Sequence, residues 1–163
     1  GSMGIQIAKM LGARVITTAG SDWKLEKAKQ LGADELINYN QTPNLSQRIK
    51  ELTHGKGVDL VFDVVGADVW EENILSLKQG GRLVITGVTS GARTNMNLSI
   101  LQGRPLTLMG SGGRSRRTLP ELMKTINQGT LHGRSFYTYD DDDELQCVDL
   151  GGHRVDKKQL PRS

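Results

Sequence analysis

The chain has 163 residues, of which 36% are hydrophobic and 24% charged, and its net charge at pH 7 is +3. These values fit one globular domain with a sizeable core. The single cysteine, Cys147, excludes an internal disulfide and a cysteine-rich zinc site. No run approaches the roughly 18 apolar residues of a membrane span, no signal peptide is visible, and the basic cluster at residues 114–117 has no interleaved aromatic residues. We therefore expect a cytoplasmic protein that binds neither membranes nor nucleic acid.

The first four residues look like the back half of a glycine-rich nucleotide-binding turn. They are followed at once by a helical pattern at residues 5–11, which Gly12 ends, and by an apolar strand at residues 14–18. In a dinucleotide-binding fold the phosphates sit on such a turn and on the N-terminus of the helix after it. The alternative is that Gly-Ser-Met is the remnant of a cleaved expression tag and carries no information about the fold.

Helix and strand patterns alternate along the rest of the chain. Ser21 is a good N-cap for the second helix, because a serine hydroxyl can accept the unpaired N–H groups of the first turn. Leu45, Ile49 and Leu52 lie on one face of a third helix. We predict helices at residues 5–11, 22–31, 45–52, 69–77, 98–102 and 118–129, and strands at residues 14–18, 35–38, 58–65, 82–87 and 106–110.

This alternation predicts an α/β fold with a doubly wound, parallel, Rossmann-type sheet. No strand precedes the first turn, so we expect the sheet to lack its first strand and the neighbouring strands to be unpaired at that position. Ligands bind such sheets at the carboxyl ends of the strands. The predicted ends lie at residues 18–21, 38–39, 64–66, 87–89 and 110–112, and the candidate site residues there are Ser21, Tyr39, Val65, Gly66, Gly87, Val88, Thr89, Gly110 and Ser111.

Four segments match, in order, the helices and strands of a known family. They are residues 4–16, 24–34, 57–66 and 80–87. Together they resemble the cofactor-binding domain of the medium-chain dehydrogenase/reductase superfamily, in its quinone oxidoreductase and zinc-type alcohol dehydrogenase branch. The resemblance covers roughly residues 1–133 and favours the nucleotide-binding turn over the tag remnant. It implies a cofactor-binding role for Gly1, Ser2, Met3 and Gly4.

The resemblance also implies a function for the parent protein. Hydride would pass from NADPH to a quinone, enone or carbonyl, and the cofactor would do that chemistry. The N-terminal domain that supplies the substrate pocket, and the zinc ligands of zinc-dependent members, would lie upstream. We therefore expect the chain to be an N-terminally incomplete NAD(P)-binding domain that is inactive by itself, binds no zinc and contributes no catalytic residue. Dimerisation with a second copy is a further implication.

The end of the second predicted strand indicates NADPH rather than NADH. An enzyme that prefers NADH usually places a carboxylate there to bind the ribose 2′-hydroxyl, but this chain has Ala19. Lys24 would pair with the 2′-phosphate, Ser21 would donate a hydrogen bond to it, and Tyr39 would stack on adenine or bind the phosphate. The opposing observation is Asp22, whose carboxylate could replace the missing one. Each of the three residues also has a purely structural alternative.

The C-terminal 30 residues depart from the family pattern. Residues 140–144 form a block of like charges, which is usually disordered, and no apolar strand follows before Ser163. We therefore divide the chain into a domain at residues 1–133 and a divergent, poorly ordered acidic tail at residues 134–163. The alternative to a fragment of an enzyme is a stand-alone, non-catalytic nucleotide-binding or interaction module.

Overall fold

The computed structural model describes residues 1–112, 124–125, 128–129, 131 and 146–149. Five helices and a short 3₁₀ turn alternate with the first five strands. The helices are α1 (Ser2–Met10), α2 (Asp22–Gln30), α3 (Leu45–Leu52), α4 (Trp70–Ser76) and α5 (Leu98–Gly103), and the 3₁₀ turn spans Ala67–Val69. The strands are β1 (Arg14–Ala19), β2 (Glu35–Asn38), β3 (Val58–Asp63), β4 (Leu77–Ile85), β5 (Thr107–Gly110) and β6 (Gln146–Asp149).

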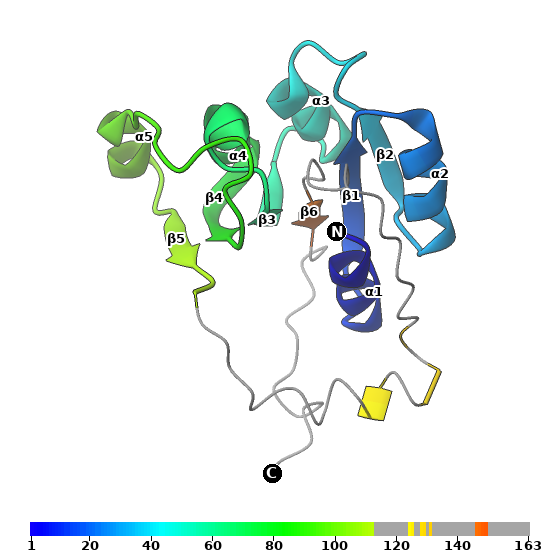
Figure 1. The fold of residues 1–163 in the computed structure, drawn as a ribbon. Coiled ribbons are helices and arrows are strands. Elements are labelled where there is room, and N and C mark those ends of the chain that lie inside the picture. Colours follow the sequence, from blue (N-terminus) through cyan, green and yellow to red (C-terminus); the bar gives the residue numbers. More distant parts are fainter. Residues whose placement is uncertain (113–123, 126–127, 130, 132–145, 150–163) are drawn as a thin grey trace.

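The strands form one twisted sheet in the order β2-β1-β6-β3-β4-β5. Strand β1 pairs in parallel with β2, β3 with β4, and β4 with β5. Figure 1 shows the helices distributed over the two faces of this sheet. The prediction of a doubly wound, Rossmann-type α/β fold is confirmed.

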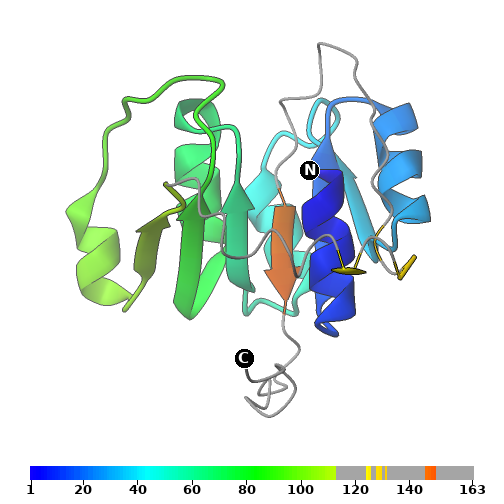
Figure 2. The same ribbon diagram turned by 60° about the horizontal axis from the view of Figure 1, so that its bottom comes forward.

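The gap between β1 and β3 is filled by β6, and this corrects the expectation of unpaired neighbours. Strand β6 runs antiparallel to both: Val148 pairs with Val15 on one side and with Leu60 on the other. Figure 2 shows its arrow pointing opposite to those of its neighbours. The sheet is therefore mixed rather than wholly parallel. Backbone N–H and C=O groups in the middle of a sheet need partners, and β6 supplies them to β1 and β3. The division at residue 133 stays a prediction, but residues 146–149 belong to the sheet.

Alternating residues of the strands separate two cores. Ile16, Ile37 and Val61 pack with Ile49 of α3 and Ile74 of α4 on one face. Val15 packs with Ile5 and Ala8 of α1 and Ala28 of α2 on the other. Ile5, Ile16 and Ile49 are at most 1% exposed, and fully burying such a side chain contributes about 1.5–3 kcal/mol. The two cores therefore decide which face of the sheet each helix covers.

Two strand boundaries differ from the sequence prediction. Strand β3 ends at Asp63 rather than at residue 65, because the Asp63 side chain accepts the N–H groups of Val65 and Gly66. Strand β4 starts at Leu77 rather than at residue 82, because Leu77 already pairs with Val58. The predicted turn at residues 80–81 is a register shift inside β4. The helix predicted at residues 118–129 and the acidic block at 140–144 lie outside the described residues, apart from 124–125 and 128–129.

Candidate functional site

A cavity of about 260 Å³ lies at the carboxyl ends of β1, β2 and β3. Thr18 is at the end of β1, Tyr39 directly follows β2, and Val65 follows β3. Leu45 of α3 and three residues from the following loops complete the lining: Asp68, Val69 and Ser90. This is the edge at which parallel sheets bind ligands. Of the predicted site residues, Tyr39 and Val65 line this cavity.

Tyr39 is held against the end of β1. Its backbone N–H donates to Ala19 O at 3.2 Å. A Cβ atom at Gly20 would come within 2.5 Å of the Tyr39 hydroxyl oxygen, so only glycine lets the ring approach this closely. Asn40 Nδ2 donates to Gly20 O at 2.8 Å and ties the two segments together. The position of Tyr39 therefore depends on the missing side chain at Gly20.

Two loops on the other side of the cavity are joined by backbone hydrogen bonds. We call residues 64–67 and 86–91 the paired loops. Val65 O accepts both the N–H and the hydroxyl of Ser90, at 2.9 and 3.0 Å. Ala67 N donates to Gly91 O at 3.1 Å, and Gly66 forms a β-bridge with Gly91. The paired loops therefore behave as one unit.

Two glycines allow the backbones of the paired loops to approach each other. A Cβ atom at Gly87 would lie 2.5 Å from Val64 O, and one at Gly66 would lie 2.7 Å from Gly91 O. Gly66 also has φ +98°, a conformation that residues other than glycine rarely adopt. The predicted residues Val65, Gly66 and Gly87 are thus brought together by close backbone packing. Val88 and Thr89 lie in the same unit but are exposed.

The side chain of Asp63 holds the first of the paired loops, residues 64–67, at the end of β3. It is 0% exposed. Its Oδ1 accepts the N–H of Val65 at 2.8 Å and of Gly66 at 3.1 Å. Burial raises the pKa of Asp63, while these two N–H groups and the nearby Asn73 amide lower it by less. Asp63 Oδ2 and both polar atoms of the equally buried Asn73 amide have no hydrogen-bond partner of good geometry in the part of the chain that is described.

The first four residues form the beginning of a helix rather than a separate turn. Gly1 is the N-cap of α1, and Gly1 O accepts the N–H of Gly4 at 2.9 Å and of Ile5 at 3.4 Å. Figure 2 shows the start of α1 on the same side as the arrow tips of the parallel strands. The first N–H groups of a helix have no partner within the helix, and together with the helix dipole they favour an anion there. Their cofactor role stays a prediction.

Ser21 and Lys24 lie at the start of α2, beside Gly20. Ser21 is the N-cap, as predicted, but its hydroxyl makes no capping hydrogen bond and is buried without a described partner. The Lys24 ammonium lies 5.7 Å from the centre of the Trp23 ring, and that of Lys27 lies 4.6 Å from it. The Asp22 carboxylate accepts Asn38 Nδ2 at 2.7 Å. Neither Ser21 nor Lys24 is part of the cavity lining.

Gly110 and Ser111 also lie at the carboxyl ends of the parallel strands, but on the β5 side of the sheet. Strand β5 is one of the two edge strands and ends at Gly110, while Ser111 N donates to Ile85 O at 2.8 Å. They do not line the cavity beside Tyr39. Their role in cofactor binding stays a prediction.

Several lining residues were not among the predicted site residues. Thr18 lies on a predicted strand end, and the spacing of Leu45 predicts only a core position on its helix. Asp68, Val69 and Ser90 come from loops whose approach to the cavity follows from the hydrogen bonds of the paired loops. The one available signal was the position of Ser90 directly after Thr89, at a predicted strand end.

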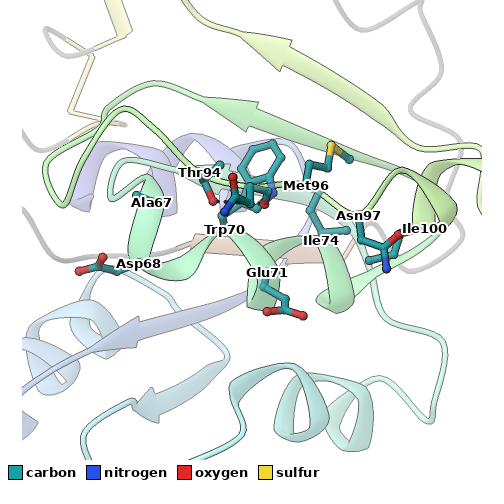
Figure 3. Close-up of a pocket in the computed structure, with 10 residues that line it drawn as sticks. Ala67, Asp68, Trp70, Glu71, Ile74, Thr94, Met96, Asn97 and Ile100 are labelled. Atoms are coloured by element: carbon teal, nitrogen blue, oxygen red, sulfur yellow. Dashed lines mark hydrogen bonds between the residues drawn. The ribbon is translucent and has the colours of Figure 1, made fainter.

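A larger cavity of about 590 Å³ lies beside α4 and the segment at residues 94–100. Trp70 and Met96 lie together there, while the carboxylate of Glu71 points away from them (Figure 3). None of the predicted site residues lines this cavity. The smaller cavity is the better candidate site because three strand ends converge on it.

Two further properties concern the described part of the chain. No three His, Cys, Asp or Glu side chains lie together there as a metal site would need. None of the helices within it is long and apolar enough to cross a membrane.

Residues 1–128 match the family model described as zinc-binding dehydrogenase. Among curated proteins, the chain is 44% identical over 101 residues to quinone oxidoreductase 1 of Escherichia coli strain K12, which covers 62% of this chain and 31% of that protein. It is 32% identical over 143 residues to prostaglandin reductase 1 of Bos taurus, which covers 80% of this chain and 43% of that protein. The chain thus spans about a third to two fifths of these relatives.

Solved structures show the same similarity. The Escherichia coli quinone oxidoreductase complexed with NADPH superposes with a TM-score of 0.72 at 36% identity, over 80% of this chain and 43% of that one. An NAD-dependent alcohol dehydrogenase superposes with a TM-score of 0.74 at 41% identity, over 80% of this chain and 38% of that one.

Proposed function

The chain belongs to the zinc-binding dehydrogenase family, in the quinone oxidoreductase and zinc-type alcohol dehydrogenase branch of the medium-chain dehydrogenases and reductases, and we propose that it forms the NADPH-binding part of an oxidoreductase. The observation that carries the proposal is the cavity where β1, β2 and β3 end, with Tyr39 against Gly20 on one side and the paired loops on the other. The reaction proposed for the whole protein is hydride transfer to a quinone, enone or carbonyl.

The residues fit a nicotinamide dinucleotide in three respects. Tyr39 and Val65 both line the cavity, and an aromatic and an apolar side chain there suit the adenosine end. The N-terminus of α1 favours the pyrophosphate. Gly66 and Gly87 let the two paired loops pack backbone against backbone beside the cavity, which holds the wall formed by Val65 and Ser90 in place. When bound, the cofactor supplies the hydride, and this chain's part is to bind and orient it.

Lys24 supports NADPH over NADH. It lies one turn into α2, close to the end of β1, where Ala19 offers no carboxylate for a ribose 2′-hydroxyl. The Asp22 carboxylate is held by the Asn38 amide. An ammonium group at this place attracts the 2′-phosphate that only NADPH carries. If instead the Asp22 carboxylate binds the ribose 2′-hydroxyl, the chain should prefer NADH, and this is the opposite outcome of the experiment below.

The test is a titration of the chain with NADPH and, separately, NADH, following nicotinamide fluorescence. We expect NADPH to bind more tightly, and Lys24→Ala to weaken NADPH about tenfold while leaving NADH unchanged. Lys27→Ala is the matched control, because it removes the same charge from the same helix and from the same Trp23 ring. Preference for NADH, or equal losses in the two variants, would refute the role of Lys24. Absence of binding by the wild-type chain would refute the proposal for this chain.

A further inference from the structure

The buried side chain of Asp63 and its backbone carbonyl together hold both loops beside the cavity. One oxygen, Oδ1, accepts two N–H groups of the loop that lines the cavity. The main chain of the same residue accepts the second loop: Asp63 O takes the N–H of Thr86 at 2.7 Å and its hydroxyl at 3.0 Å. Asp63 is therefore the residue at which both paired loops are attached to the end of β3.

The attachment controls the shape of the cavity wall. Val65 lines the cavity, and its carbonyl accepts Ser90, which also lines it. Releasing the N–H groups of Val65 and Gly66 would leave two buried donors unpaired, which a loop relieves by moving toward solvent. Because Ser90 is hydrogen-bonded to Val65 O, such a movement would shift both lining residues at once.

The second carboxyl oxygen indicates what Asp63 requires of its surroundings. Oδ2 and the Asn73 amide are fully buried and lack partners of good geometry among the described residues. Neither Asp63 nor Asn73 lines the cavity. The nearby Asn73 amide lowers the pKa of Asp63, as a hydrogen-bond donor does, but by less than burial raises it. The amide of asparagine at residue 63 would keep one accepting oxygen in a side chain of the same shape.

We propose that Asp63 is a positioning residue for the cofactor, which sets the affinity of the cavity by holding the paired loops without itself touching the ligand. The inference rests on the proposed function, because it takes NADPH to be the ligand of the cavity. The hold of Asp63 Oδ1 on the N–H groups of Val65 and Gly66 can be measured without any ligand.

The experiment compares Asp63→Ala with Asp63→Asn in the whole chain. We expect Asp63→Ala to bind NADPH at least about tenfold more weakly, and Asp63→Asn to stay within about threefold of wild type, because asparagine keeps the accepting oxygen. Amide hydrogen exchange at Val65 and Gly66 in the free protein should accelerate in Asp63→Ala and stay slow in Asp63→Asn.

The matched control is Val58→Ala, at the other end of the same strand. Val58 is 0% exposed, so this variant is also destabilised, but it is far along β3 from the cavity. It should bind NADPH as wild type does. Should Asp63→Ala fail to fold, Thr86→Val removes the hydroxyl that donates to Asp63 O while keeping the side-chain shape, and we expect it to weaken NADPH about threefold.

Three outcomes would overturn the inference: unchanged exchange at Val65 and Gly66 in Asp63→Ala, equal losses of NADPH binding in the Ala and Asn variants, or an equal loss in Val58→Ala. A wild-type chain that binds no NADPH refutes the proposed function instead. The exchange measurement then still decides whether Asp63 holds the loop.

Discussion

The hydroxyl of Tyr39 lies so close to the α-carbon of Gly20 that a Cβ atom at residue 20 would be 2.5 Å from it. The two residues come from the ends of neighbouring parallel strands, and each directly follows its strand. The contact closes one side of the candidate cofactor cavity. The absence of a side chain at Gly20 therefore helps to determine the shape of the site.

Gly20→Ala should therefore impair binding more than folding. The added methyl group meets the far end of the Tyr39 side chain and no backbone atom, so we expect the free energy of unfolding to change by less than about 1 kcal/mol. NADPH affinity should fall about three- to tenfold. Gly103→Ala, where an added Cβ has no neighbour within 4 Å, is the control. Fluorescence titration and urea unfolding of both variants measure the two effects, and unchanged affinity in Gly20→Ala would contradict the role of Tyr39.

Gly66→Ala should destabilise the protein more than Gly55→Ala. Both glycines have positive φ, +98° and +81°, and alanine at either position costs about 1–2 kcal/mol. Only at Gly66 would the new Cβ meet backbone, at 2.7 Å from Gly91 O and 2.9 Å from Val88 Cα. We expect a further loss of at least about 1 kcal/mol there. Urea unfolding tests this, and equal losses would mean that the paired loops separate freely.

Val148→Pro should show whether β6 completes the sheet. Val148 pairs with Val15 and Leu60, so it lies between two strands. Proline removes an N–H in the middle of a sheet and costs about 3 kcal/mol or more. Val148→Thr keeps both the N–H and the β-branched shape and should be clearly more stable. Thermal unfolding of the two variants at one protein concentration compares them. Equal melting temperatures would contradict the place of β6 in the sheet.

Asp63 should make stability fall as pH rises above the acidic range. Its pKa is raised from the ordinary value of 3.8, first of all by burial. The folded chain thus holds the proton more tightly than the unfolded chain. This contribution to stability is fully present below pH 3.8 and is lost as pH rises through the folded pKa. Asn does not titrate, so Asp63→Asn should gain stability relative to wild type over that interval. Urea unfolding at several pH values measures it, and a constant difference would contradict the raised pKa.

Asp34 should act in the opposite direction. Burial alone would raise its pKa, but the Lys9 ammonium at 2.8 Å, the N–H of Val15 and the charge of Arg14 together lower it. Its contribution is present above pH 3.8 and is lost as pH falls through the lowered pKa. Because the pair is about one third exposed, Lys9→Met should cost no more than about 1 kcal/mol at pH 7 and less at pH 2. Lys29→Met, on the exposed side of α2, is the charge-matched control.

The local elements could be predicted from the sequence because their signals are local. Leu45, Ile49 and Leu52 mark one face of α3, and glycines and strand residues place β1, β2 and β5 within a residue or two. The residues of four segments, 4–16, 24–34, 57–66 and 80–87, carried the resemblance to the family. The alternation of helices and strands indicated which edge of the sheet carries the site, since parallel sheets bind ligands at the carboxyl ends of their strands.

Tertiary structure decided the contacts between segments that are distant in sequence. That β6 fills the gap between β1 and β3 follows from backbone pairing in three dimensions, since the sequence around Gln146 carries no strong strand pattern. The same holds for the early end of β3, where the Asp63 side chain accepts two N–H groups, and for Ser90, which is held at the cavity by hydrogen bonds with Val65 O and Asp68 N. Periodicity reports which face of an element is buried, whereas a hydrogen bond between loops depends on where the whole sheet brings their ends together.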